Sequence, residues 1–273
     1  MTAADILNKK RSGQKMTMLT AYDHPTAMLL DQSGIDVILV GDSLANVVLG
    51  LESTTQVGMI EMLHHCKAVS RAVKKALVLG DMPFEAYQID PQKSVANATL
   101  FIQEAGCGAV KLEWFDACAE VAASIVKAGI PVMGHVGLTP QTVTSREGMK
   151  VQGKDAIAAK RIIAQAQSLQ DAGCFAIVLE CVPLELAAII TEKLSIPTFG
   201  IGAGKYCDGQ VLVSHDVLGL SLKFSPKFSK KYVDLAPLMR DAFRTFKEEV
   251  VSGSFPDDAH SFHMPPEELK NLS

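Results

Sequence analysis

The chain has 273 residues, 48% of them apolar, which is enough to bury a large core. Its formal net charge of -4 gives no basic surface of the kind that binds nucleic acid, and no apolar run approaches the roughly 18 residues of a membrane span. The N-terminal segment has neither the apolar stretch nor the cleavage site of a secretory signal. Six scattered cysteines without a CxxC pair predict reduced thiols in a cytoplasmic protein, and no motif supports the alternative of a catalytic cysteine.

In chain order, the first half of the sequence predicts four short apolar strands, the first of them within 15–23. The second lies in "DQSGIDVILVGDS" (31–43), where a helical stretch ends at a glycine and is followed by an apolar strand that ends in an acid. The third lies in 74–84 and ends at Asp81, and "QEAGCGAVKLEWF" (103–115) repeats the pattern of helix, glycine, strand and acid. Such continuously apolar strands indicate a sheet that is covered on both faces.

The second half of the sequence continues this alternation. The stretch "QDAGCFAIVLECV" (170–182) aligns almost position for position with 103–115, and further strands are predicted in 130–140, 196–204 and 210–219. Helix-start residues and period-3.6 patterns predict helices that begin at Asp90 and Pro91, that lie within 153–173 and 182–194, and that run over 233–253 with Gly253 closing the last one.

Eight apolar strands that alternate with helices predict a parallel sheet covered by helices. A (β/α)8 barrel accounts for all eight strands, and a doubly wound open sheet is the main alternative. No linker or low-complexity stretch divides the chain. We therefore expect residues 1–273 to form a single barrel domain with an N-terminal helix and a C-terminal helix and tail.

Charged and polar side chains occur at the C-terminal ends of the predicted strands, which is where a barrel of this kind has its active site. They are Asp42 and Ser43 after the second strand, Asp81 after the third, Lys111 and Glu113 at the end of the fourth, His135 at the end of the fifth and Glu180 at the end of the sixth. The geometry of a barrel would bring them together at one mouth.

Four carboxylates at one mouth repel one another strongly unless positive charges compensate them. Lys111 supplies one positive charge, and a divalent metal is the natural second source. Oxygen ligands without a thiolate suit a hard ion such as Mg²⁺, which typically uses one or two carboxylates together with substrate and water. The pattern therefore predicts a magnesium site that includes Asp42.

Several of these residues also have a simpler interpretation. A single acid after a strand is commonly the N-cap of the next helix, although capping does not explain the whole set. Lys111 lies on the same side of its strand as Glu113, so the two could form only a buried ion pair. His135 could be a core histidine, and the glycine-rich stretch at 200–204 could cradle a phosphate or simply allow close packing.

A series of longer motifs, in order along the chain, resembles the ketopantoate hydroxymethyltransferase family (3-methyl-2-oxobutanoate hydroxymethyltransferases). The motifs are "GDSLANVVLG", "GDMPFEAY", "VKLE", "GHVGLTPQT", "KVQGK", "LECVP", "GIGAGKYCDGQVLV" and "GSFPDDAHSFH". The resemblance extends over nearly the whole chain. Two pairs of residues, Ala45 with Asn46 and Trp114 with Phe115, differ from those usual in the family, and they affect the shape of the loops.

The resemblance implies a (β/α)8 TIM barrel of the phosphoenolpyruvate/pyruvate superfamily type. It also implies one Mg²⁺ per subunit and a cytoplasmic homodecamer built as a pentamer of dimers. The family's site residues fall on Asp42, Asp81 and Glu113 for the metal, on Asp42, Ser43, Asp81, Lys111 and His135 for the substrate, and on Glu180 for the general base.

The reaction that the resemblance implies transfers a hydroxymethyl group from the cosubstrate 5,10-methylenetetrahydrofolate to 3-methyl-2-oxobutanoate, in pantothenate biosynthesis. Glu180 would remove the C3 proton, with Mg²⁺ as a Lewis acid for the resulting enolate, and 2-dehydropantoate and tetrahydrofolate would be the products. Two alternatives are a Mg²⁺-dependent lyase of an oxo-acid and a barrel that only binds a keto acid. The sequence lacks the "KxCG" lid motif usual in such lyases, and a pure binder needs no base beside its metal.

Overall fold

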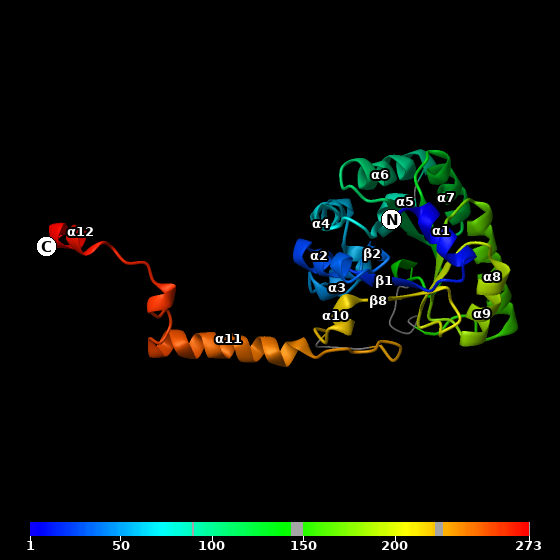
Figure 1. The fold of residues 1–273 in the computed structure, drawn as a ribbon. Helices are drawn as coiled ribbons and strands as arrows, with labels where there is room; N and C mark the ends of the chain where they lie inside the picture. The colour runs from blue at the N-terminus through cyan, green and yellow to red at the C-terminus, as the bar shows by residue number, and fades with distance from the viewer. Residues whose placement is uncertain (89, 143–149, 222–225, 273) are drawn as a thin grey trace.

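The structure is a computed structural model of the chain, and it describes residues 1–88, 90–142, 150–221 and 226–272. Eight parallel strands form a closed barrel in sequence order, with β8 paired to β1 (Figure 1). The strands are β1 (Met16–Thr20), β2 (Val37–Val40), β3 (Leu77–Asp81), β4 (Ala109–Glu113), β5 (Val132–Gly137), β6 (Ala176–Glu180), β7 (Thr198–Ile201) and β8 (Gly209–Leu212). The predicted barrel is confirmed, and the open sheet is wrong because the sheet closes on itself.

Helices surround the barrel (Figure 1). The longer ones are α1 (Ala3–Arg11), α2 (His24–Gln32), α4 (Met59–Ala72), α6 (Pro91–Gln103), α7 (Cys118–Lys127), α8 (Ala156–Asp171) and α9 (Leu184–Lys193). Short turns of helix follow several strands, namely α3 (Leu44–Val47), η1 (Thr54–Gln56), α5 (Phe84–Tyr87), η2 (Pro140–Thr142) and α10 (Ser214–Val217). As predicted, α6 begins at Asp90 and Pro91, and the Asp90 carboxylate accepts hydrogen bonds from two backbone N–H groups of the first turn.

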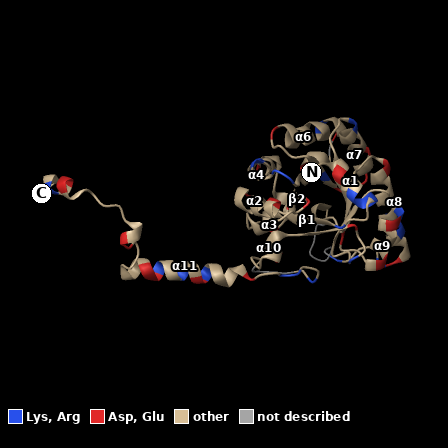
Figure 2. Cartoon of the chain, viewed as in Figure 1, with Lys and Arg blue, Asp and Glu red and all other residues tan. Residues whose placement is uncertain are grey.

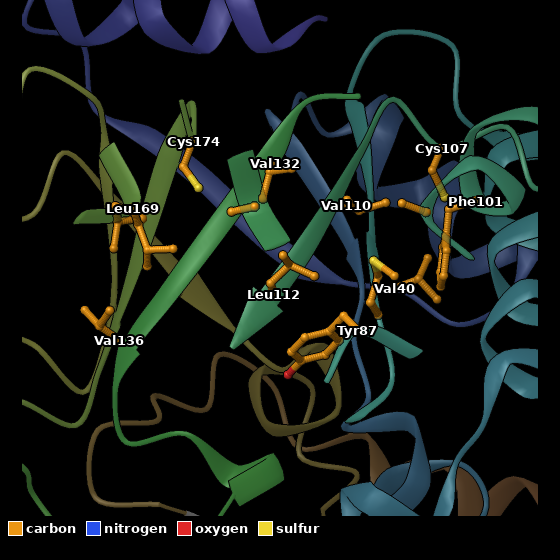
Figure 3. Packing of buried hydrophobic residues seen from close by; sticks show 14 of the residues in the cluster. Val40, Tyr87, Phe101, Cys107, Val110, Leu112, Val132, Val136, Leu169 and Cys174 are labelled. Atoms are coloured by element: carbon orange, nitrogen blue, oxygen red, sulfur yellow. The ribbon is translucent and has the colours of Figure 1, made fainter. Parts of the chain in front are cut away.

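Side chains of the strands alternate between the barrel interior and the layer beneath the helices. On β4, Ala109 belongs to the interior cluster, whereas Val110 and Leu112 belong to the outer cluster. Figure 3 shows Val110 and Leu112 in this outer layer, with Phe101 of α6 and Val132 of β5 among their neighbours in the cluster. The period of two therefore places Lys111 and Glu113, like Ala109, on the interior face. The two residues share one side of the strand, as the sequence predicted.

The C-terminal region leaves the barrel. The helix α11 (Leu235–Ser252) extends away from it and is followed by η4 (Asp258–His260), α12 (Pro266–Leu269) and η5 (Lys270–Leu272) (Figure 1). No residue of α11 is buried. Its exposed residues Met239, Phe243, Phe246 and Val250 recur every three or four positions and form one face, here called the α11 stripe. Charged residues of both signs also lie along this helix (Figure 2). Gly253 ends it with a φ of 74°, as predicted.

The six cysteines all have free thiols, and five of them are buried. Burial raises the pKa of the Cys118 thiol and of the Cys181 thiol to about 12. Thiolate formation, which nucleophilic reactivity requires, is therefore unfavourable at both residues near neutral pH. Among the described residues, the structure contains no helix with the length and apolar character needed to cross a membrane.

Candidate active site at the C-terminal end of the barrel

A cavity of about 270 Å³ lies at the C-terminal ends of the strands. All seven residues predicted from the sequence line it: Asp42, Ser43, Asp81, Lys111, Glu113, His135 and Glu180. Other lining residues include Asn46, Ile201, Asp216 and Phe228. The volume is just below the range of about 300–1,000 Å³ that is usual for drug-sized ligands. It therefore suits a small substrate.

Strand register brings the charged residues together. Asp81 on β3 is paired with Lys111 on β4, and Glu113 is paired with His135 on β5. Glu180 ends β6 on the next strand of the barrel, opposite Gly137. Residues far apart in the chain thus become neighbours because parallel strands align at the same end of the sheet.

Lys111 forms the central ion pair of the site. Its Nζ lies 2.6 Å from Asp81 Oδ1 and 3.7 Å from Glu113 Oε1, and all three side chains are buried. Burial disfavours the charged lysine, but attraction to Asp81 and Glu113 outweighs it and raises the pKa of Lys111. The buried ion pair that the sequence allowed as an alternative is therefore present, and it forms part of the cavity wall.

His135 provides a second positive charge. Its Nδ1 lies 3.3 Å from Glu113 Oε1, and its Nε2 lies 3.3 Å from Glu180 Oε2. Burial opposes the protonated ring, yet the Glu113 and Glu180 carboxylates raise the pKa of His135 to about 9. The residue is buried, but it stands between two carboxylates and not in an apolar core. The raised pKa favours the protonated ring, which lies between Glu113 and Glu180 at the edge of the cavity.

Asp42 follows β2 and is not a helix cap. Its backbone N–H donates to Asp81 Oδ2 at 3.2 Å, and the N-cap of α3 is Ser43, whose side chain makes no capping bond. The Ser43 hydroxyl is instead hydrogen-bonded to Tyr22 Oη at 2.9 Å. Burial and repulsion from Asp81 and Glu113 raise the pKa of Asp42 to about 7. A cation close to this carboxyl group would favour its charged form.

Two residues of the site were missed by sequence reasoning. Gln141, in η2, donates from Nε2 to Asp42 Oδ2 at 3.0 Å and from its backbone N–H to Glu113 Oε2 at 2.9 Å. Tyr87, in α5, donates from its hydroxyl to Gln141 Oε1. Gln141 could have been noticed because it follows the end of β5 in the motif "GHVGLTPQT". Tyr87 likewise ends the motif "GDMPFEAY", which begins at the end of β3.

The backbone around Glu180 is tightly constrained. Gly137 has a φ of 100°, and a Cβ at this position would lie 2.3 Å from the Glu180 carbonyl oxygen. The residue after Glu180, Cys181, has a φ of 47°, which is rare for a residue other than glycine. Its N–H donates to the Ile201 carbonyl oxygen at 2.9 Å. Strained backbone of this kind concentrates at functional sites, where the surroundings hold it in place.

The residues that depart from the family pattern shape the surroundings of the site without adding charge. Ala45 is buried, and Asn46 lines the cavity while its amide donates to the Leu51 carbonyl oxygen at 2.9 Å. Trp114 and Phe115 are partly buried against the outer cluster.

Comparison with known proteins shows the family of the chain. The chain is 52% identical to a 3-methyl-2-oxobutanoate hydroxymethyltransferase of Syntrophomonas wolfei over 272 residues, covering 100% of this chain and 99% of that one. A protein of the same name from Syntrophobacter fumaroxidans is 53% identical, with 100% of this chain and 96% of that one covered.

Solved structures show the same fold at much lower identity. A phosphonopyruvate hydrolase bound to oxalate and Mg²⁺ has a TM-score of 0.61 at 14% identity, covering 100% of this chain and 95% of that one. A 2,3-dimethylmalate lyase of the PEP mutase/isocitrate lyase superfamily has a TM-score of 0.57 at 16% identity, covering 100% of this chain and 91% of that one. The sequence profile of ketopantoate hydroxymethyltransferase matches residues 1–258. The chain belongs to the ketopantoate hydroxymethyltransferase family.

Proposed function

We propose that this protein transfers a hydroxymethyl group from 5,10-methylenetetrahydrofolate to 3-methyl-2-oxobutanoate and so forms 2-dehydropantoate for pantothenate biosynthesis. Family membership supports the pathway and the type of transfer. The single observation that carries the chemistry is the cavity in which Lys111 and His135 stand among four carboxylates. This arrangement offers both positive charge for a keto acid and a carboxylate that can accept a proton.

The donor set fits a divalent cation, although no group of three His, Cys, Asp or Glu residues in the described ranges is already arranged as a metal cluster. Burial and repulsion from neighbouring carboxylates raise the pKa of Asp42 and Asp81, and a dication would relieve that repulsion. Mg²⁺ commonly takes only one or two carboxylates and completes its sphere with substrate and water. We propose Asp42 and Asp81 as its direct ligands.

Glu113, the third predicted ligand, is already engaged at both oxygens. Its Oε1 faces Lys111 and His135, and its Oε2 accepts the backbone N–H of Gln141. We therefore propose that Glu113 contacts the cation through water. A cation held at this site supplies Lewis-acid stabilisation of the negative charge that develops on the keto oxygen.

The protein's own groups would then act on the substrate. Lys111 is the buried cation nearest to Asp81 and would neutralise the substrate carboxylate, with Ser43 and His135 as further contacts. Glu180 would take the proton from C3, and the electrons of the C–H bond would form the enolate. The enolate carbon would attack the methylene carbon of the folate as one carbon–nitrogen bond breaks. A water molecule would supply the hydroxyl oxygen of the product as the second carbon–nitrogen bond breaks, and tetrahydrofolate would leave with a proton on each of the two nitrogens.

Two alternatives from the sequence have less support. Lyases of the PEP mutase/isocitrate lyase superfamily share the fold, but their likeness of about 15% identity shows the fold alone, whereas the relatives at 52% identity share the name of the transferase. A barrel that only binds a keto acid has no use for Glu180 at the edge of the cavity. We keep hydroxymethyl transfer as the conclusion.

The assembly is also a proposal. We propose that residues 1–273 form one catalytic barrel domain and that the protein self-associates into the cytoplasmic decamer implied by its family. The α11 stripe supports self-association, because phenylalanines that are 58% and 64% exposed on a helix outside the barrel are costly to leave in water. The occupant that we propose for this stripe is a second copy of the chain.

The test of the reaction is deuterium exchange at C3 of 3-methyl-2-oxobutanoate in D₂O, followed by NMR with and without Mg²⁺ and with and without tetrahydrofolate. We expect Mg²⁺-dependent exchange that falls by about 10²–10⁴-fold in Glu180→Gln, the range typical of a lost general base. The matched control is Glu185→Gln, which changes an exposed glutamate on α9. If Glu180→Gln exchanged C3 deuterium at the wild-type rate, Glu180 would not be the base. If the wild-type protein showed no exchange, the proposed enolate chemistry would be wrong.

A further inference from the structure

Gln141 links the carboxylate of Asp42, which follows β2, to the carboxylate of Glu113, which ends β4. Its side-chain amide donates to Asp42 Oδ2 at 3.0 Å and to the Met82 carbonyl oxygen at 3.2 Å, while its backbone N–H donates to Glu113 Oε2 at 2.9 Å. The side chain is buried, with 3% of its surface exposed. One residue thus fixes one oxygen of each carboxylate, and it does so from the short helix η2 after β5.

The orientation of the Gln141 amide is determined by Tyr87. The Tyr87 hydroxyl donates to Gln141 Oε1, and the same hydroxyl accepts the backbone N–H of Glu113 at 3.3 Å. Turning the amide over would place its oxygen against the Asp42 carboxylate and the Met82 carbonyl, which are both acceptors. The amide therefore has one stable orientation, with its NH₂ group toward Asp42.

Tyr87 is itself held in place by packing. Its ring belongs to the outer apolar cluster and is fully buried, and it contacts Phe115 with the ring centres 5.6 Å apart. Figure 3 shows the ring near Leu112 and Val40, with the hydroxyl oxygen at the edge of the cluster. The result is a chain of contacts from the apolar layer through Tyr87 and Gln141 to Asp42.

We propose that Gln141, oriented by Tyr87, is the positioning residue that sets Asp42 and Glu113 for binding of a divalent cation. This inference rests on the cation site of the proposed function and adds the residues that hold its ligands. Hydrogen-bonded partners of metal ligands fix the rotation of those ligands, and removing such a partner typically weakens metal binding by about 10–100-fold. Sequence motifs for metal binding do not identify such a role, because Gln141 and Tyr87 would not touch the cation.

The test measures cation binding directly, without turnover. Mn²⁺ replaces Mg²⁺ as the probe, and its free concentration and bound spectrum are followed by EPR in wild type, Gln141→Leu, Tyr87→Phe and the double variant. Gln141→Leu removes the bond to Asp42, so the Kd for Mn²⁺ should rise about 10–100-fold and the bound spectrum should change. Tyr87→Phe should raise the Kd less. The double variant should be no worse than Gln141→Leu, because Tyr87 acts through Gln141.

The matched control is Gln167→Leu on α8, which removes a bond of the same kind. There the amide of Gln167 donates to Asp171 Oδ1 at 2.8 Å, outside the barrel. This variant should bind Mn²⁺ like the wild type. Circular dichroism and metal-free unfolding temperatures show whether each variant is folded. Should Gln141→Leu fail to fold, Tyr87→Phe carries the test, because it removes one oxygen atom and keeps the ring in its cluster.

The outcomes separate this inference from the proposed function. A folded Gln141→Leu with unchanged Mn²⁺ affinity and spectrum overturns the positioning role while leaving the cation site in place. Additive effects of the two substitutions overturn the idea that Tyr87 acts through Gln141. Absence of Mn²⁺ binding by the wild type overturns both the cation site and the positioning role. Absence of C3 exchange with intact, Gln141-dependent Mn²⁺ binding overturns only the proposed reaction.

Discussion

Replacing Lys111 by methionine tests whether the charge balance of the site is as described. Methionine keeps the unbranched apolar part of the side chain and removes the cation that lies 2.6 Å from Asp81 and 3.7 Å from Glu113. At an effective dielectric constant of about 20, the 2.6 Å pair alone amounts to about 6 kcal/mol of attraction. Much of this attraction offsets the cost of removing the two charges from water. Loss of one partner of a buried pair is therefore expected to cost about 3–5 kcal/mol of unfolding free energy.

The unfolding free energy that Lys111→Met loses should increase with pH. Without Lys111, the pKa of Asp81, which burial already raises, should rise further. An acid whose pKa is higher in the folded state than in the unfolded state takes up a proton on folding. The cost of its buried charge is therefore absent below the unfolded pKa and complete above the folded one. Lys111→Met should lose more stability at pH 8 than at pH 5.

Thermal unfolding of the metal-free protein at the two pH values measures this effect. For a chain of this size, a loss of 3–5 kcal/mol corresponds to a fall in Tm of about 6–20 °C. The double variant Lys111→Met/Asp81→Asn removes both charges and should recover at least half of the fall. The control Lys67→Met breaks an exposed 3.1 Å pair with Glu104 and should cost under about 1 kcal/mol. An equal loss at both pH values, or a double variant as unstable as the single one, would refute the reasoning.

Three further results are expected. Gly137→Ala should lower stability by about 1–3 kcal/mol and reduce C3 exchange, because its Cβ would lie 2.3 Å from the Glu180 carbonyl oxygen; an unchanged Tm would contradict this. Because the pKa of Asp42 is about 7, the Kd for Mn²⁺ should be constant above pH 7 and rise about tenfold for each pH unit below it. A Kd that stays the same from about pH 5.5 to 8.5 would exclude competition between protons and Mn²⁺ at this carboxylate. Phe243→Glu combined with Phe246→Glu should shift sedimentation toward smaller species, whereas Arg240→Glu should not.

Much of the fold could be predicted because its signals are local. Seven strands lie inside the stretches that the sequence predicted, and β8 begins one residue before its predicted stretch, at Gly209. Runs of apolar residues between a helix-ending glycine and a polar residue leave few other structures. The interior direction of Lys111 and Glu113 followed from the period of two along β4. Their closeness to Asp81 and His135 followed from the parallel register of a barrel.

The remainder of the site depends on contacts that no local pattern contains. Tyr87 and Gln141 are 54 positions apart and come from short irregular segments, so their hydrogen bond arises only when β3 and β5 stand in the same barrel. His135 was expected to be either a substrate contact or a core residue. Its role as a second buried cation depends on two carboxylates from neighbouring strands. The sequence predicted the helix of α11, but amphipathic spacing says nothing about what covers its apolar face.

The separation of α11 from the barrel has a consequence for how the chain acquires its structure. An isolated helix of 18 residues is only marginally stable in water, and α11 has no buried residue to stabilise it. Its helical content should therefore depend on protein concentration, whereas that of the barrel should not. Dilution would be expected to melt α11 first, as a separate cooperative unit, with loss of far-ultraviolet ellipticity and exposure of the segment around residues 226–234 to proteases. The barrel would then fold within a single chain. The C-terminal helix would become ordered only when chains associate.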